Sequence, residues 1–302
     1  MGEREGLSVA ALAGTTGTVA KRKKPYALLV LLPVGAFICL GFVVPLALLL
    51  LQSLHAPQGF GLLPSSSLSF SSYIQVVETP VYRTLALNTL QIAGIGTLLT
   101  TVLTFPVAYF IRFRLKRGQN LVLMLTLILL FAGYIVKVYT WRIILGRYGV
   151  LNTLLVATGL IHQPLSVLLF SKLAVFIVVT YLSLPVSILI LVGAMQNVEP
   201  ALIENARDLG AGGVRAVIKV LVPLAMTGVV ASLAYGFVAI AGDYITPQLV
   251  GGPSGQMVGV AIYDQFVNAG NEPGGSVLTL LMLLAFVVVY VLLKQLERLR
   301  PV

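Results

Sequence analysis

The sequence has little charge and few side chains that could bind a metal or form disulfides. Only 10% of its 302 residues are charged, whereas a soluble domain carries roughly 25% charged residues. Its one cysteine is Cys39, and its two histidines are His55 and His162. A disulfide within the chain is therefore excluded, and a thiol-bound metal site is disfavoured. So little polar surface cannot cover a soluble globule, and we expect lipid to be the solvent.

The sequence also lacks the motifs by which proteins bind nucleotides or nucleic acids. It has no GxxxxGK[ST] phosphate loop and no Gly-Lys dipeptide at all, so it has no P-loop with which to hydrolyse ATP. Lys and Arg number 20 against 10 Asp and Glu, but aromatic residues do not alternate with them, and we expect no nucleic-acid partner. In a membrane protein this excess indicates which ends of the spans face the cytoplasm.

Long apolar segments make up most of the chain, which is 58% hydrophobic. A helix needs about 20 apolar residues to cross a bilayer. The sequence therefore predicts an all-α, polytopic membrane protein with six transmembrane helices. The predicted spans are Tyr26–Leu51, Leu85–Ile111, Leu121–Val138, Leu173–Met195, Leu224–Ala241 and Val277–Leu293.

A seventh span is possible at Tyr148–Ser171, which is uncharged and Leu-rich but interrupted by Gly149, Gly159 and Pro164. Seven spans would divide Lys and Arg equally between the two sides, whereas six spans with an inside N-terminus place most of them in the cytoplasm. We therefore predict six spans, with Tyr148–Ser171 as an outer surface helix or a re-entrant piece buried in protein. The predicted organisation is a disordered cytoplasmic tail, a transmembrane domain and a cytoplasmic C-terminal end, at residues 1–25, 26–295 and 296–302.

One polar segment, residues 198–224, lies between two apolar runs and reads VEPALIENARDLGAGGVRAVIKVLVPL. Pro200 suits a first helical position, where its missing N–H costs nothing, and Asn197 or Glu199 can cap the helix. Gly210 stands where a left-handed residue ends a helix. A second amphipathic stripe, from Val214 to Leu221, should stop at Pro223. We expect two short helices around a glycine elbow.

The faces of the first of these helices differ in chemistry. Leu202, Ala206 and Leu209 share an apolar face, while Glu204 and Asp208 share an exposed acidic one. Such a knob can dock in a cleft of a partner protein. The alternative is an ordinary helical loop whose charges are solvated.

The spacing of this segment resembles the EAA loop of bacterial ABC-transporter permeases, where the membrane domain meets its ATPase. The Glu204-Asn205-Ala206 triplet is followed by Gly210 six residues after the glutamate, and Pro223 closes the motif. Asn205 departs from the alanine of the family pattern, which is a small change. The resemblance implies that the ATPase-coupling residues are Glu204, Asn205, Ala206, Asp208, Gly210 and Pro223.

Three other stretches resemble the spermidine/putrescine subgroup of these permeases, and with them the resemblance covers about residues 26–295. It implies a type I ABC importer permease fold in the bacterial inner membrane. It also implies two permease subunits, usually homologues, a pair of ATPases that hold ATP and Mg²⁺, and an extracytoplasmic solute-binding protein, with no cofactor in this chain. Related permeases import opines, other amines and phosphonates, so the substrate stays open. The three stretches are Val138–Arg142 leading to Gly149–Asn152, Gly242–Pro247 with Gly251–Pro253, and Gly259–Phe266 with Pro273–Ser276.

Ionisable groups at membrane depth are costly and tend to be functional. Asp243 ends the apolar run of the fifth span and Lys137 interrupts the third. Asp243 either faces the substrate pathway or its outer gate, or it pairs with Lys137 or Arg142, or it caps a helix. Tyr139, Trp141 and Tyr244 form either an aromatic box for a cation or an interfacial belt. The polar face of the second span either bonds to neighbouring helices or lines the pathway; it comprises Asn88, Gln91, Thr97, Thr101 and Thr104.

Two other classes of membrane protein fit part of the sequence. Residues 252–255 match the GxSG nucleophile pattern of rhomboid-like intramembrane proteases, but that chemistry needs a histidine base, and both histidines lie outside the predicted spans. A secondary transporter or channel would account for the spans, but not for the spacing of Glu204, Gly210 and Pro223.

Overall fold

The computed structural model describes residues 26–55, 68–115 and 117–298. The predicted tail, residues 1–25, and most of the predicted C-terminal end lie outside this range. The chain divides into two compact units, Met1–Leu48 and Leu49–Val302. Within the first unit, α1 (Tyr26–Ile38) runs through a π-helical turn (Cys39–Val43) into α2 (Val44–Ser53), which reaches the second unit. From Leu32 to Ser53 the apolar side chains are mostly exposed, as expected for a helix that faces lipid.

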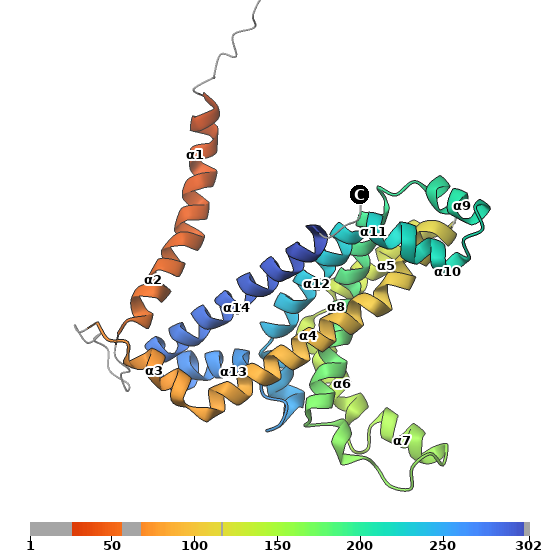
Figure 1. The fold of residues 1–302 in the computed structure, drawn as a ribbon. Helices are drawn as coiled ribbons and strands as arrows, with labels where there is room; N and C mark the ends of the chain where they lie inside the picture. The colour runs from red at the N-terminus through yellow and green to blue at the C-terminus, as the bar shows by residue number, and fades with distance from the viewer. Residues whose placement is uncertain (1–25, 56–67, 116, 299–302) are drawn as a thin grey trace, which may run out of the picture. The chain divides into compact units, whose positions relative to one another are not determined.

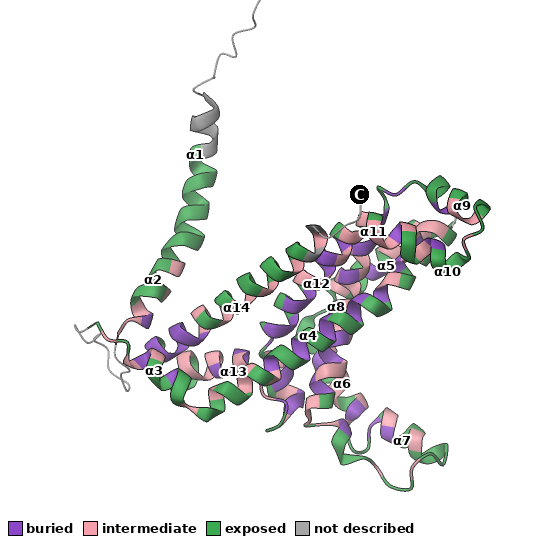
Figure 2. Cartoon of the chain, viewed as in Figure 1, coloured by how far each residue is buried: buried purple, intermediate pink, exposed green. Residues whose placement is uncertain are grey.

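The second unit is a helical bundle (Figure 1). Its core is formed by three long helices that pack on one another: α4 (Pro80–Tyr109), α8 (Lys172–Met195) and α12 (Met226–Ala241). Figure 2 shows buried residues gathered along these helices. The other helices are α3 (Ser71–Glu78), α5 (Gln119–Phe131), α6 (Tyr134–Leu145), α7 (Val150–Ala157), α9 (Pro200–Asp208), α10 (Gly213–Ala216), α11 (Val222–Leu224), α13 (Val258–Tyr263) and α14 (Glu272–Arg298).

The helices agree with the predicted six spans, with one correction. Among the described residues, four helices are long and apolar enough to cross a membrane, and the number is six when each of two bent helix pairs is counted as one span. The third predicted span, Leu121–Val138, is wrong as a continuous helix. It breaks at Ala132 and Gly133, both extended, and α5 meets the helical stretch from α6 to α7 at 88°. A glycine lowers the cost of such a break, and the run stays apolar across it, so hydropathy does not reveal it.

Buried hydroxyl groups, not ions, join the three core helices in the middle of the bundle. Thr104 Oγ1 of α4 lies 2.7 Å from Ser187 Oγ of α8, and Ser187 Oγ lies 2.6 Å from Ser232 Oγ of α12. Thr101 Oγ1 completes the group at 3.1 Å from Ser232 Oγ. We call Thr101, Thr104, Ser187 and Ser232 the hydroxyl cluster. Thr101 and Thr104 of the predicted polar face therefore bond to neighbouring helices, one of the two uses expected of them.

Close packing of α8 and α12 depends on a missing side chain at Gly228. A Cβ atom at this position would lie 2.1 Å from Ala194 Cβ. We expect Gly228→Ala to push the helices apart and to cost about 1–3 kcal/mol of stability, the usual penalty for overpacking. Thermal unfolding of the purified permease in detergent measures this. Gly193→Ala is the matched control, because a Cβ there meets nothing within 4 Å. Equal melting temperatures for the two variants would contradict the predicted clash.

Candidate functional site

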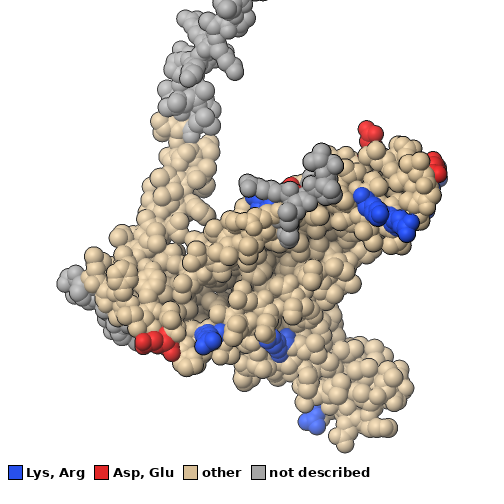
Figure 3. Space-filling model, in the orientation of Figure 1, with Lys and Arg blue, Asp and Glu red and all other residues tan. Residues whose placement is uncertain are grey.

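The predicted coupling segment, residues 198–224, forms the two short helices expected of it. Pro200 begins α9, and Gly210 has φ +85°, the left-handed elbow between α9 and α10. Glu204 and Asp208 are both exposed. Figure 3 shows acidic and basic side chains at this end of the second unit, whereas the face between its ends is nearly uncharged. The segment is thus a charged knob on an otherwise apolar bundle.

Two details of the knob differ from the prediction. Glu199 occupies the N-cap position of α9, but its side chain makes no capping hydrogen bond. The buried face of α9 carries Ile203, at 3% exposure, whereas Leu209 is 89% exposed and Leu202 is 42% exposed. The reason lies in tertiary packing, because Ile203 packs into the core cluster around Leu191 and Leu221. This packing decides which side of α9 is buried, against the apolar face predicted from residue spacing. An exposed apolar surface is left beside the acidic one.

Pro223 lies close to a bend, but it does not end the helix. After α10 the backbone widens into a π-helical turn (Val217–Leu221), continues through α11 and breaks only at Ala225. A π-helical turn changes which carbonyls face the proline, whose ring clashes with an ordinary α-helical partner. The stretch Gly213–Leu224 then meets α12 at 74°. The knob is therefore joined to α12 through a sharp corner.

Asp243 lies at the far end of α12 from that corner and is 9% exposed. The Tyr134 hydroxyl at the start of α6 donates to its Oδ2 at 2.5 Å. The backbone N–H groups of Ile245 and Thr246 donate to its Oδ1 at 2.9 and 3.1 Å. Of the uses predicted for Asp243, the structure shows helix capping, because these two N–H groups are the first of the helical stretch that begins at Ile245. A carboxylate so buried and so fully bonded orders the loop after α12.

Lys137 and Arg142, the predicted alternative partners of Asp243, point to other groups. Lys137 Nζ donates to the carbonyls of Leu129 and Leu130 at 3.1 and 3.4 Å, which places its charge at the C-terminal end of α5, where a cation is favoured. The Arg142 guanidinium lies over the rings of Tyr139 and Phe170, at 6.0 and 5.5 Å from their centres. The prediction that Asp243 pairs with either cation is wrong.

A cavity of about 310 Å³ opens beside the break between α5 and α6. Its polar lining comes from Tyr134, Lys137, Ser183, Tyr235 and Asp243. The carboxylate of Asp243 and the two phenols are groups that attract an organic cation. Lys137 brings a positive charge to the same lining, and its ammonium is bonded to the carbonyls of Leu129 and Leu130. This cavity is the best candidate in the described residues for part of a substrate pathway.

The three aromatic residues predicted as a box do not meet in the structure. Trp141 packs edge-on against Tyr181 at 5.2 Å between ring centres, and Tyr244 stacks on Tyr263 at 5.2 Å. Tyr139 is 47% exposed and lies under Arg142. Each ring thus has its own neighbour, and a role for Tyr139, Trp141 or Tyr244 in substrate contact stays a prediction.

Residues 93–300 match the family described as binding-protein-dependent transport system inner membrane component. The chain belongs to this family. The spermidine/putrescine transport system permease protein PotB of Haemophilus influenzae is 31% identical over 72% of this chain and 78% of its own length. The inner membrane ABC transporter permease protein YdcU of Escherichia coli is 30% identical over 74% of each chain. These similarities confirm the prediction of an ABC importer permease.

Solved structures show the same fold. The crystal structure of a bacterial ABC transporter involved in the import of the acidic polysaccharide alginate aligns with a TM-score of 0.67 and 17% identity, over 90% of this chain and 94% of that one. A second structure, of a bacterial alginate ABC transporter with an alginate pentasaccharide-bound periplasmic protein, gives the same TM-score at 16% identity. At such low identity the likeness supports the fold alone, and it confirms the predicted permease fold.

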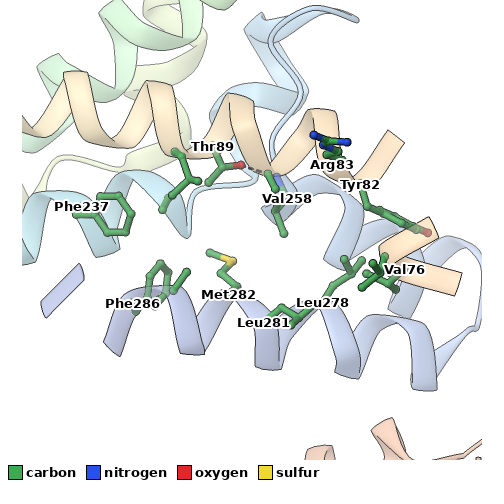
Figure 4. Close-up of a pocket in the computed structure, with 15 residues that line it drawn as sticks. Val76, Tyr82, Arg83, Thr89, Phe237, Val258, Leu278, Leu281, Met282 and Phe286 are labelled. Atoms are coloured by element: carbon green, nitrogen blue, oxygen red, sulfur yellow. Dashed lines mark hydrogen bonds between the residues drawn. The ribbon is translucent and has the colours of Figure 1, made fainter. Parts of the chain in front are cut away.

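A second cavity of the permease, of about 470 Å³, does not suit a polar substrate. Figure 4 shows Phe237, Leu278, Met282 and Phe286 among the side chains around it, with Arg83 and Tyr82 near one end. The Thr89 hydroxyl is already bonded on both sides: it donates to the carbonyl of Leu85 at 2.8 Å and accepts the backbone N–H of Val258 at 2.9 Å. The mostly apolar lining disfavours this cavity as a place for a charged molecule.

The structure adds Tyr134, Tyr235 and Arg207 to the residues found from the sequence. Tyr134 directly follows the break between α5 and α6. In the sequence, only its position next to Gly133 within an apolar run distinguishes it. Arg207 lies within the motif, but its bond to Tyr109 joins residues that are 98 positions apart. Contacts of that range leave no periodic pattern in a single sequence.

Proposed function

We propose that this permease carries a polyamine such as spermidine or putrescine across the bacterial inner membrane, driven by ATP that partner subunits hydrolyse. The observation that carries the substrate class is the 31% identity, over 72% of the chain, to a relative named as a spermidine/putrescine permease. The cavity beside Asp243 supports it, since an organic cation leaving water needs fixed negative or aromatic groups to offset its desolvation.

The exposed coupling segment supports an ATPase partner. Its acidic face, with Glu204 and Asp208, lies beside the exposed side chains of Leu202 and Leu209, and apolar groups bordered by polar ones are usual in protein interfaces. A pair of ATPase subunits, which hold ATP and Mg²⁺ themselves, docks on this segment at the cytoplasmic face of the two permeases. The second permease is a homologue of this chain, and a solute-binding protein delivers the substrate from the extracytoplasmic side.

This arrangement requires a definite orientation in the membrane. The coupling segment and both ends of the chain face the cytoplasm, in agreement with the basic residues around Lys21–Lys24 and Arg112–Arg117. Ser254 and the α7 region then face outward. The binding protein approaches on that outer side, opposite to the ATPases.

Uptake by proteoliposomes tests the proposal. The permease is reconstituted with its ATPase, second permease and binding protein, with ATP enclosed and radiolabelled spermidine outside. We expect saturable uptake that requires both enclosed ATP and the binding protein. Unlabelled putrescine should compete with the labelled spermidine. Uptake without ATP would indicate a secondary transporter. Uptake of an opine, another amine or an aminophosphonate in place of spermidine would refute the polyamine substrate and retain the importer.

A further inference from the structure

The end of α4 and the coupling helix α9 are joined by one polar contact between side chains. Arg207 Nη2 donates to the hydroxyl of Tyr109, the last residue of α4, at 2.9 Å. The Tyr109 ring itself packs on Phe113, with 5.4 Å between ring centres. Arg207 sits in the last turn of α9, where a cation interacts well with the helix dipole.

The burial of Arg207 argues that this contact has a purpose beyond packing. Its side chain is partly buried, and its Nε is buried without a hydrogen-bond partner among the described residues. An unpaired buried donor is unfavourable, and an aliphatic side chain would fill the same place without that cost. The bond from Nη2 to the Tyr109 hydroxyl is what the guanidinium gains in return for that cost.

A hollow separates α9 from α4 around this bond. It measures about 280 Å³ and is bounded by Phe113 on one side, by Pro200 and Glu204 of α9 on the other, and by the bonded pair itself. Ile203 anchors α9 to the core cluster that contains Leu191 of α8. Arg207 is thus the polar tie from α9 to α4 across a space that side chains do not fill.

Further contacts along α4 connect Tyr109 to the core of the bundle. Thr104 lies five residues earlier on the same helix, about 7.5 Å along its axis at 1.5 Å per residue. Its hydroxyl meets Ser187 of α8, and Ser187 meets Ser232 of α12. A movement of α9 that shifts the end of α4 would therefore act on the cluster that joins all three core helices.

We propose that Arg207 is a positioning residue that ties the coupling helix to α4, so that movement of the docked ATPase reaches α4 directly and not only through α8 and α12. This inference rests on the proposed docking of an ATPase at residues 198–224. The bond sets how much transport each ATP turnover yields; it is not required for the ATPase to bind, since Arg207 turns toward Tyr109 and not outward.

A double-mutant cycle in proteoliposomes tests the proposal. Tyr109→Phe keeps the ring and removes the hydroxyl, and Arg207→Met removes the donor. ATPase co-purification, ATP hydrolysis and spermidine uptake are measured on the same preparation. We expect co-purification to be unchanged and uptake per ATP to fall about fivefold in each single variant, the low end of usual coupling strengths. The double variant should fall no further, because both changes remove one contact. Arg207→Lys should restore part of the loss, because one N–H suffices for the bond.

The matched controls are Tyr148→Phe and Arg147→Met, an exposed Arg–Tyr neighbour pair in which the guanidinium lies 6.0 Å from the ring centre. They should leave uptake per ATP unchanged. An unchanged ratio in the Tyr109 and Arg207 variants, or additive losses in the double variant, would overturn the positioning role. Lost ATPase co-purification would show that the pair serves assembly instead, which also overturns it. Absence of ATP-driven uptake by the unsubstituted complex would overturn the proposed function itself.

Discussion

Gly210→Pro should abolish ATP-driven uptake while the permease still inserts in the membrane. Gly210 has φ +85°, whereas proline is held near −65°. Its N–H also donates to the carbonyl of Arg207 at 2.9 Å, and proline has no N–H to replace it. The elbow between α9 and α10 cannot form, so the knob loses the shape that docks. Co-purification of the ATPase and uptake in proteoliposomes measure the loss together.

Milder substitutions at Gly210 distinguish the effect of backbone conformation from the effect of steric clash. A Cβ there meets nothing within 4 Å, so Gly210→Ala tests the left-handed backbone alone, at a cost of about 1–2 kcal/mol. Roughly tenfold weaker docking follows from that energy. Gly210→Asn should lose less, because asparagine tolerates this conformation. Gly212→Ala is the control in the same loop, with ordinary φ −56° and open space. Equal docking by Gly210→Pro and Gly212→Ala would refute the elbow.

Asp243→Asn should reduce polyamine uptake by about tenfold or more, the size of effect expected for removing a charged hydrogen-bonding group. Asparagine keeps the shape and most of the bonds. Its carbonyl can still accept from the backbone of Ile245 and Thr246, and its amide can donate to the Tyr134 hydroxyl. The change therefore removes the negative charge that faces the cavity while leaving the loop after α12 capped.

Tyr134→Phe is the matched control for Asp243. It removes the bond to Oδ2 but leaves the carboxylate charged. If the charge of Asp243 acts on the substrate, the Asp243→Asn variant should lose uptake and the Tyr134→Phe variant should lose much less of it. The two variants should have similar melting temperatures. If both variants lose stability and uptake in parallel, Asp243 serves the structure only. Lys137→Met gives a further comparison, and we expect it to affect α5, whose carbonyls Lys137 binds, more than uptake.

The coupling segment was predictable because its structure is local. Pro200 at the start of a helix, Gly210 at a left-handed elbow and the charged face of Glu204 and Asp208 depend on neighbours only a few residues away. Which apolar residue of α9 is buried was not predictable, because Ile203, Leu202 and Leu209 give the short helix apolar groups on more than one side. Packing of Ile203 into the core cluster that contains Leu221 decides between them.

The residues around the cavity beside Asp243 show the opposite case. Asp243 was recognised from the sequence because a carboxylate at the end of an apolar run is costly, but its partner, Tyr134, lies 109 positions away. The break at Ala132 and Gly133 was missed because the residues on both sides are apolar, and hydropathy does not report a change in helix direction. The same break creates the cavity, so its lining could not be assembled from spacing alone.

The hydroxyl cluster in the bundle core has one more consequence, for the electrical behaviour of the transporter. Thr101, Thr104, Ser187 and Ser232 are neutral, and voltage exerts work only on charge, about 2.3 kcal/mol for each elementary charge moved through 100 mV. Rearranging this cluster as the core helices shift would move no charge across the bilayer. The membrane potential therefore does no work on the rearrangement of these four hydroxyl groups. The proposed polyamine substrate, in contrast, is a cation and would be drawn inward by the same potential.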